Sequence, residues 1–298
     1  MLEIKNITKC YGTLKAVDNL SFTVNEGEIF GLLGVNGAGK TTTFRLINRL
    51  ITQDEGTILL DGKPINYDVT DNIGFVPEER SLLPKLTVLK QAIYYGVLKG
   101  MDEASIEERL DYWLERFGIP EYKNKKIKEL SKGNQQKIQL IVAILHNPKL
   151  LILDEPFSGL DPINAELFTD VIRELSNQGT AIIFSSHRME HVELFCQKLV
   201  ILLKGRSVLE GDLKEIKERY RKKNIIIEGD VDIDELKKIP GVLEVNLTEN
   251  IEVKIESNDV INKVFKYIAK CSNITKFTVE EPSLNEIFVA KVGESYEE

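Results

Sequence analysis

The sequence predicts an α/β fold that is followed by a smaller α+β domain. Three short apolar runs, at residues 28–33, 149–154 and 180–186, are each followed by a helical pattern. Strands that alternate with helices in this way form a mainly parallel sheet. A helical insert at residues 87–147 interrupts the alternation, and the pattern changes again after residue 215.

The elements of the first domain, residues 1–215, follow from local patterns. The segments before residue 24 are predicted to be strands, and "GTILLDGKPI" places an Asp61-Gly62 turn signal between two more. These segments indicate an antiparallel part beside the parallel sheet. Within residues 87–147, apolar residues recur at three- and four-residue spacing, which is typical of helices. The stretch "LVILLKGRSVLEGD" is predicted to close the domain as a hairpin.

The second domain, residues 224–298, follows a charged linker helix predicted at residues 216–223. Its patterns run strand, helix, strand, strand, helix, strand, which is the order of a ferredoxin-like unit. The ending "SLNEIFVAKVG" is predicted to add one more helix.

Composition excludes several classes of function. The net charge of −8 and the pI of about 5.3 argue against nucleic acid as the main partner. Cys10, Cys196 and Cys271 lie far apart, which fits neither a metal site nor a disulfide framework and indicates a reducing compartment. The N-terminus has no apolar signal region, and no apolar run approaches the roughly 18 residues that span a bilayer. We therefore expect another chain to supply any membrane span.

A glycine-rich stretch, "GVNGAGKT" at residues 34–41, fits the pattern of a phosphate-binding loop. A predicted strand precedes it and a predicted helix follows, as the mechanism requires. The glycines let backbone N–H groups turn toward phosphate oxygens. Lys40 can reach the β- and γ-phosphates, and the Thr41 hydroxyl can bind Mg²⁺.

A pair of carboxylates ends the apolar strand in "LLILDEP", residues 150–156. Asp154 is placed to hold a Mg²⁺ ion, and the adjacent Glu155 can act as general base on an attacking water. The alternative is a plain acidic turn, which the phosphate-binding loop upstream makes the weaker interpretation.

A competing pattern is His187-x-x-Glu190-His191, which fits the H-x-x-E-H motif of some zinc peptidases. No third ligand can be identified, and His187 follows a predicted strand instead of lying within a helix. We expect His187 to contact the γ-phosphate, His191 to lie on a helix surface, and His146 to lie at a helix end.

A second candidate anion site is "LSKGNQQK", residues 130–137, directly before an apolar helix. Ser131 and the amide of Gly133 would lie in the first turn, where helix N–H groups have no internal partner. The alternative is that Ser131 only caps the helix.

Together these motifs resemble the ATP-binding cassette (ABC) family over residues 1–215. By this resemblance, "LSKGNQQK" is the signature segment, residues 158–161 are the D-loop, and His187 is the switch histidine. The resemblance assigns the nucleotide to Tyr11, Gly34, Asn36, Gly37, Ala38, Gly39, Lys40, Thr41 and Thr42, with Tyr11 stacked on adenine. In this family two cassettes stack head to tail, so Ser131 and Gly133 would bind the γ-phosphate held by the other copy.

Two departures from the family pattern stand out. Lys132 and Asn134 replace the third and fifth residues of the usual Leu-Ser-Gly-Gly-Gln signature. In "GFVPEER", Glu78 occupies the position of a metal-binding glutamine and adds a negative charge near Mg²⁺. The expected metal ligands are therefore Thr41, Asp154 and Glu78.

The resemblance implies an ATPase subunit of an exporter-type transporter that binds MgATP and forms a homodimer. It would act with a separate transmembrane permease at the inner face of the cell membrane, without nucleic acid. The C-terminal unit resembles the accessory extension of such subunits. The alternative is a soluble ABC ATPase acting on DNA or ribosomes, but the sequence shows no long coiled-coil insertion, zinc cysteines or second cassette.

Overall fold

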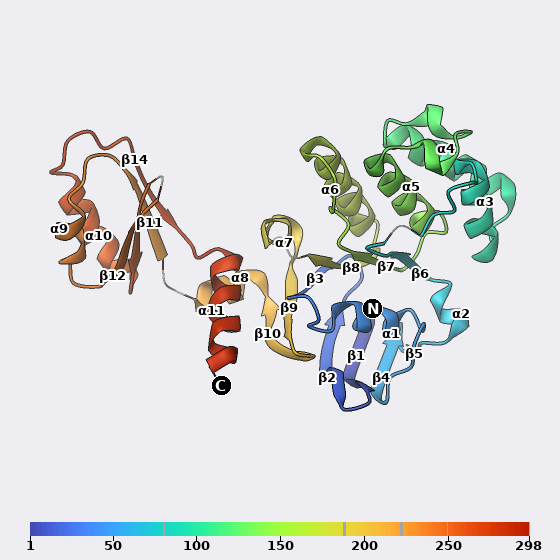
Figure 1. Cartoon of the computed structure of the whole chain (residues 1–298), viewed down its shortest axis with the longest axis horizontal. Coiled ribbons are helices and arrows are strands. Elements are labelled where there is room, and N and C mark those ends of the chain that lie inside the picture. The colour runs from blue at the N-terminus through green and yellow to red at the C-terminus, as the bar shows by residue number, and fades with distance from the viewer. Residues whose placement is uncertain (80, 187–188, 221–222, 249, 298) are drawn as a thin grey trace. The chain divides into compact units, whose positions relative to one another are not determined.

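The computed structural model describes residues 1–79, 81–186, 189–220, 223–248 and 250–297. The chain forms two compact units, Met1–Glu210 and Gly211–Glu298, which are described separately below (Figure 1). The domain limits expected from the sequence, at residues 215 and 224, stay predictions.

One sheet of the first unit is antiparallel, with strand order β2-β1-β4-β5. Asp61 and Gly62 turn the chain between its last two strands with φ of 50° and 73°. Both values lie in the left-handed region, as the tight hairpin turn predicted there requires. The strands are β1 (Leu2–Tyr11), β2 (Leu14–Val24), β4 (Glu55–Leu60) and β5 (Lys63–Pro64).

The other sheet has the order β10-β9-β3-β8-β7-β6 and is parallel from β9 to β6. All residues of β3, β7 and β8 are buried, which explains why these strands are continuous apolar runs in the sequence. The strands are β3 (Ile29–Gly34), β6 (Ile73–Val76), β7 (Leu150–Asp154), β8 (Ala181–Ser186), β9 (Lys198–Leu203) and β10 (Arg206–Asp212). Four helices accompany the two sheets: α1 (Lys40–Ile47), α2 (Tyr67–Thr70), α6 (Pro162–Asn177) and α7 (Met189–Phe195).

A single apolar core joins the two sheets around α1, which lies between them (Figure 1). The rings of Phe22 and Phe30 stack with centroids 4.9 Å apart and so tie β2 to β3. Phe44 of α1 is fully buried in the same core. This packing fixes the start of α1 against the end of β3, where the phosphate-binding loop lies.

The predicted helical insert consists of α3 (Val88–Leu98), α4 (Glu103–Arg116) and α5 (Lys132–Ile144), with short 3₁₀ turns at Pro120–Tyr122 and Ile127–Glu129. Each α-helix begins with a side-chain cap, from Thr87, Asp102 and Ser131 in turn. None of the helices in the described part of the chain is both long and apolar enough to cross a membrane.

The second unit contains a four-stranded antiparallel sheet of order β12-β13-β11-β14, with helices that follow β11 and β13. This order is that of the predicted ferredoxin-like fold. Val260, Val264 and Ile268 recur along one face of α10 and pack on the central strands. The elements are α8 (Leu213–Arg219), β11 (Lys223–Glu228), α9 (Ile233–Lys237), β12 (Val242–Leu247), β13 (Ile251–Ile255), α10 (Asn258–Ile268), β14 (Lys276–Glu280) and α11 (Leu284–Glu297).

His146, just beyond α5, makes stability depend on pH. Burial, followed by the positive charge of Lys99, lowers the pKa of His146 from 6.5 to about 4. The unfolded chain therefore binds a proton that the folded chain does not, and stability falls as the pH drops from about 6.5 to about 4. From this pKa difference we expect His146 to account for a loss of about 3 kcal/mol over that window.

The His146→Gln variant should lose this part of the pH dependence, as measured by urea unfolding between pH 7 and pH 4. Carboxylates also titrate in this range. The quantity to compare is therefore the slope of the unfolding free energy against pH in the wild type and in the variant. Equal slopes for the wild type and the variant would show that His146 does not stay neutral in the folded protein.

Candidate nucleotide-binding site

The phosphate-binding loop connects β3 to α1 at the carboxyl edge of the parallel sheet. Gly37 and Gly39 have φ of 79° and 110°, in the region that favours glycine. A Cβ atom on Gly34 would lie 2.5 Å from the Leu202 carbonyl oxygen, and one on Gly39 would lie 2.5 Å from that of Ala16. The loop glycines are therefore required both by conformation and by the close approach of neighbouring strands.

This loop borders a cavity of about 790 Å³ that lies within the first unit. The cavity brings together residues that are more than a hundred positions apart in the sequence. The predicted site residues among its lining are Tyr11, Gly34, Asn36, Gly37, Ala38, Gly39, Lys40, Thr41, Thr42, Glu78, Asp154 and Glu155.

Lys40 is buried, and its ammonium group donates to the carbonyl oxygens of Gly34 at 2.7 Å and Val35 at 3.3 Å. Burial lowers the pKa of Lys40, while the charges of Glu155, Asp154 and Glu78 act in the opposite direction. The lysine thus lies within its own loop and close to three carboxylates. A polyphosphate in this cavity would supply the negative charge that a buried ammonium group lacks.

Asp154 and Glu155 stand where β7 ends. Asp154 is almost fully buried, and its Oδ2 lies 3.4 Å from the Thr41 hydroxyl oxygen. A carboxylate and a hydroxyl this close are suitable oxygen ligands for Mg²⁺, which would neutralise phosphate charge when bound. Glu155 has a φ of 51°, which is uncommon for a residue with a side chain.

Two more predicted site residues follow strands at this edge of the sheet, Glu78 after β6 and His187 after β8. Glu78 is exposed and lines the cavity from the loop after β6. His187 follows β8 but lies outside the described residues.

Ser131 and Gly133 are not among the residues that line this cavity. Ser131 caps α5 by accepting from the Asn134 amide at 3.3 Å. A Cβ atom on Gly133 would lie 3.7 Å from the Leu160 side chain, so the signature segment adjoins the predicted D-loop of the same chain. Ser131 is an exposed residue.

The cavity also has lining residues that the sequence analysis missed: Leu14, Lys15, Ala16, Val35 and Lys204. The first three begin β2, directly after the tight turn that follows Tyr11. This closeness to Tyr11 in sequence is the one signal that could have indicated them. Lys204 comes from the turn between β9 and β10, and no local pattern indicated it.

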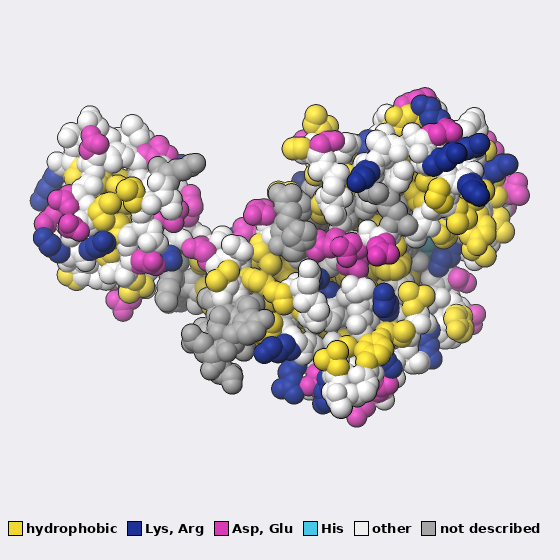
Figure 2. Space-filling view, in the orientation of Figure 1, with side chains coloured by type: hydrophobic (Ala, Val, Ile, Leu, Met, Phe, Trp, Pro, Cys, Tyr) yellow, Lys and Arg dark blue, Asp and Glu magenta, His cyan; other side chains and the backbone are white. Residues whose placement is uncertain are grey.

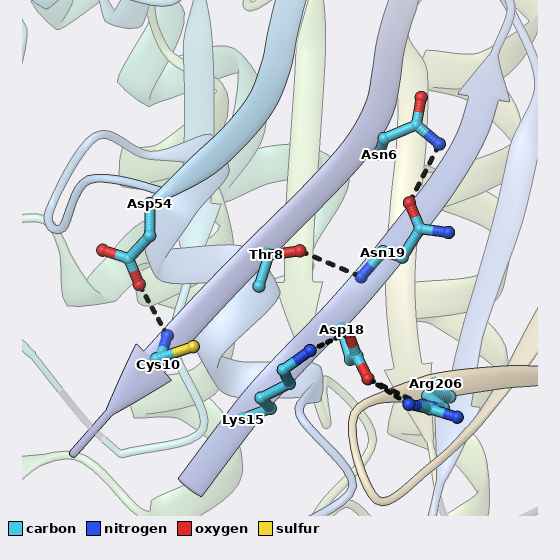
Figure 3. A network of polar contacts seen from close by, with 8 residues as sticks. All are labelled: Asn6, Thr8, Cys10, Lys15, Asp18, Asn19, Asp54 and Arg206. Carbon is cyan, nitrogen blue, oxygen red and sulfur yellow. Dashed lines mark hydrogen bonds and ion pairs between the residues drawn. The ribbon is translucent and has the colours of Figure 1, made fainter. Parts of the chain in front are cut away.

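Polar contacts join β2 to Arg206, the residue at the start of β10 (Figure 3). Asp18 of β2 accepts from Lys15 at 3.1 Å and from Arg206 at 2.7 Å, and these two cations, Lys15 first, lower the pKa of Asp18. The Asp18 amide donates to the Gly205 carbonyl, and the Gly205 amide donates to the Ala38 carbonyl within the phosphate-binding loop. The β9–β10 turn therefore fixes one side of the loop.

These features define a nucleotide-binding ATPase of the P-loop class. A family model described as "ABC transporter" matches residues 17–158, and one described as "ATP-binding protein DrrA1-3-like, C-terminal domain" matches residues 211–292. The chain is 50% identical over 298 residues to the uncharacterized ABC transporter ATP-binding protein YhaQ of Bacillus subtilis (strain 168), covering all of both chains. The chain belongs to the ABC family and is an ATP-binding protein of that family with a DrrA-like C-terminal domain.

Two further relatives bear on function. The Nod factor export ATP-binding protein I of Cupriavidus metallidurans is 35% identical over 219 residues, which is 72% of each chain. A solved structure described as a dimeric post-hydrolysis state of the ATP-binding cassette MJ0796, bound to ADP and Pi, matches with a TM-score of 0.66. It is 26% identical and covers 72% of this chain and 99% of that one.

The Glu155→Gln variant tests the predicted general base. We expect ATP affinity to stay within about twofold of the wild type, since Lys40 and the loop remain, while turnover falls at least 100-fold. The variant should also form a dimer on size-exclusion chromatography when ATP is present. Glu108→Gln, an exposed carboxylate change on α4, is the control and should leave turnover unchanged. Wild-type turnover by Glu155→Gln would refute the assignment.

Proposed function

We propose that this chain is the ATP-hydrolysing subunit of an exporter that moves its substrate through a separate transmembrane subunit. The cavity carries the proposal, because the phosphate-binding loop, Tyr11, Asp154 and Glu155 all line it. In this proposal Lys40 and the loop amides bind the phosphates, and Tyr11 stacks on adenine.

Hydrolysis would use the carboxylates and their neighbours in this cavity. Thr41, Asp154 and Glu78 would hold Mg²⁺, Glu155 would take the proton of the attacking water, and His187 would contact the γ-phosphate. The closeness of Thr41 to Asp154 supports the metal assignment, and the position of Glu78 on the cavity wall is consistent with it.

The active form would be a homodimer with two shared ATP sites. Ser131 and Gly133 would bind the γ-phosphate held by the other copy, because within one copy they lie outside the cavity lining. The similarity to a dimeric cassette bound to ADP and Pi supports this arrangement. Two nucleotides between two surfaces let ATP favour closure and hydrolysis favour separation.

The transmembrane subunit would dock on a groove between the sheet and the helical insert. A cavity of about 430 Å³ lies there, lined by residues of β6, α3 and α5. Figure 2 shows apolar side chains gathered over α3, and Tyr94, Val97 and Leu98 are each at least half exposed on that helix. Leu50, which is 64% exposed, extends the apolar rim across the groove. An exposed apolar patch of this kind is typical of a protein interaction site.

The groove and the nucleotide-binding cavity are lined by neighbouring residues. Pro77 lines the groove, and the next residue, Glu78, lines the ATP cavity. The Pro77 carbonyl accepts from Gln139 of α5 at 2.8 Å, and Ser131 caps the start of α5. Movement of a docked partner would therefore reach both the Glu78 loop and the helix that carries the signature segment.

Export is the direction that the relatives favour, since the Nod factor protein is an export subunit by name. The subunit would lie peripherally on the cytoplasmic face of the cell membrane, attached through its permease. The apolar groove also favours a protein partner over the DNA or ribosome of a soluble ABC ATPase, because nucleic-acid surfaces require positive charge.

Mixing two inactive variants tests the shared sites. Ser131→Arg blocks the signature segment, and Lys40→Ala weakens ATP binding, so each homodimer should be inactive. A mixed dimer places both lesions at one site and leaves the other site intact. About a quarter of wild-type activity should return on equal mixing, because half of the dimers are mixed and each has one working site.

If the signature segment served its own chain's nucleotide, every site in the mixture would carry one lesion. No activity would then return, although cross-linking would show mixed dimers. The control is a tandem dimer with one wild-type and one doubly mutated copy. With shared sites, each of its two sites carries one lesion and it should be inactive, whereas it would keep one intact site if the signature segment served its own chain.

The Val97→Glu variant tests the docking groove. A carboxylate on α3 should lower recovery of the transmembrane partner about tenfold, because charge in an apolar interface loses its hydration. The measurement is co-purification of the tagged protein from detergent-solubilised host membranes. Leu243→Glu, a similarly exposed apolar residue of the second unit, is the control. Equal recovery with both variants, and unchanged ATPase activity, would place the partner elsewhere.

A further inference from the structure

The side chain of Ser185 lies between the two carboxylate residues of the site. β8 pairs in parallel with β7, and this register sets Ser185 beside Asp154. Ser185 is fully buried and Asp154 is 3% exposed. The Ser185 Oγ lies 2.5 Å from Asp154 Oδ1 and 3.0 Å from the Glu155 amide nitrogen.

The direction of these two hydrogen bonds is fixed by chemistry. A backbone N–H can only donate, so the Glu155 amide donates to the Ser185 oxygen. The single hydroxyl proton of Ser185 is then free to be donated to the Asp154 carboxylate. Hydrogen bonds linked in a chain polarise one another, and a bond to a carboxylate is among the stronger kinds.

This arrangement gives the two oxygens of Asp154 different tasks. Oδ1 accepts from Ser185, while Oδ2 faces the Thr41 hydroxyl, where the proposed metal would bind. Ser185 thus sets the rotation of the carboxylate about its last bond. The partner of Oδ1 orients Oδ2, as second-shell groups do for metal-binding carboxylates in general.

The same hydroxyl acts on Glu155 through its backbone. Glu155 has a φ of 51°, a conformation that residues with a side chain adopt only when their surroundings hold them. The hydrogen bond from the Glu155 amide to Ser185 is one such restraint. An apolar residue at 185 would leave the Asp154 oxygen and the Glu155 amide each without this partner in a buried place.

We propose that Ser185 is a positioning residue for metal binding and hydrolysis, acting on Asp154 through its side chain and on Glu155 through its backbone. The inference rests on the proposed roles of Asp154 and Glu155. It assigns to β8 a part in the chemistry that none of the sequence motifs contains.

The decisive pair of variants is Ser185→Thr and Ser185→Val, because threonine and valine have nearly the same shape and differ by the hydroxyl. The first readout is the ratio of ATP affinity with Mn²⁺ to ATP affinity with EDTA, measured by calorimetry. We expect Ser185→Val to lower this ratio about tenfold, as loss of a second-shell partner does, and Ser185→Thr to stay within about twofold of the wild type. Metal-free ATP affinity should be equal in all three proteins.

The second readout is turnover at saturating Mg²⁺, which should fall about tenfold in Ser185→Val and be retained in Ser185→Thr. Ser176→Ala is the control for a buried serine, since Ser176 donates to the Gly27 carbonyl at 2.7 Å and neither residue lines the cavity. It should lower thermal stability without changing the affinity ratio or turnover.

Asp154→Asn separates failure of this inference from failure of the site assignment. If Asp154→Asn lowers the affinity ratio and Ser185→Val does not, the role of Ser185 is refuted while the metal site stands. If neither variant changes the ratio, the metal assignment of Asp154 is refuted as well. A ratio that falls equally in Ser185→Thr and Ser185→Val would show that packing, and not the hydroxyl, matters at this position.

Discussion

The first unit depends on the close approach of backbone segments around the loop between β3 and α1. Gly34 lies against the Leu202 carbonyl and Gly39 against that of Ala16, with no room for a side chain at either place. The Gly205 amide also donates to the Ala38 carbonyl of the loop. A loop enclosed in this way keeps its amides oriented before any phosphate arrives, so binding does not have to order the backbone.

The carboxyl edge of the parallel sheet then determines the chemistry. Parallel strands bring their ends to one edge, and so Asp154 and Ser185 meet beside the start of α1 although they come from different strands. The Lys40 ammonium is held by carbonyl groups of its own loop. Burial disfavours the charge on this lysine while the three carboxylates favour it. The charge on Lys40 is therefore sensitive to additional negative charge, such as that of a polyphosphate.

The helical insert connects this edge to a surface that other proteins can reach. α5 begins directly after its cap Ser131. It contains nine buried residues, Gln136 to Ile144, and contacts the Pro77 carbonyl through Gln139. A helix that is buried along most of its length moves as one body, because close packing resists local deformation. The signature segment, the Glu78 loop and the groove are therefore connected through α5.

The sequence alone determined the fold class, the family and the local motifs. The phosphate-binding loop, the "LLILDEP" strand and the cap at Ser131 could be predicted because each depends on the chemistry of a few consecutive residues. The succession of elements in the C-terminal unit likewise indicated its ferredoxin-like fold. Each of these features depends on residues that are close together in sequence, and so the sequence pattern indicates it.

Only the tertiary structure decided which distant residues complete the site. Arg206 binds Asp18 across 188 positions of sequence, and Lys204 reaches the cavity from the same turn. Ser185 meets Asp154 only because β8 lies beside β7 in one particular register. The groove at α3 likewise needs the insert to pack on the sheet. Such contacts depend on strand pairing and helix packing between segments far apart, for which a single sequence carries no periodic signal.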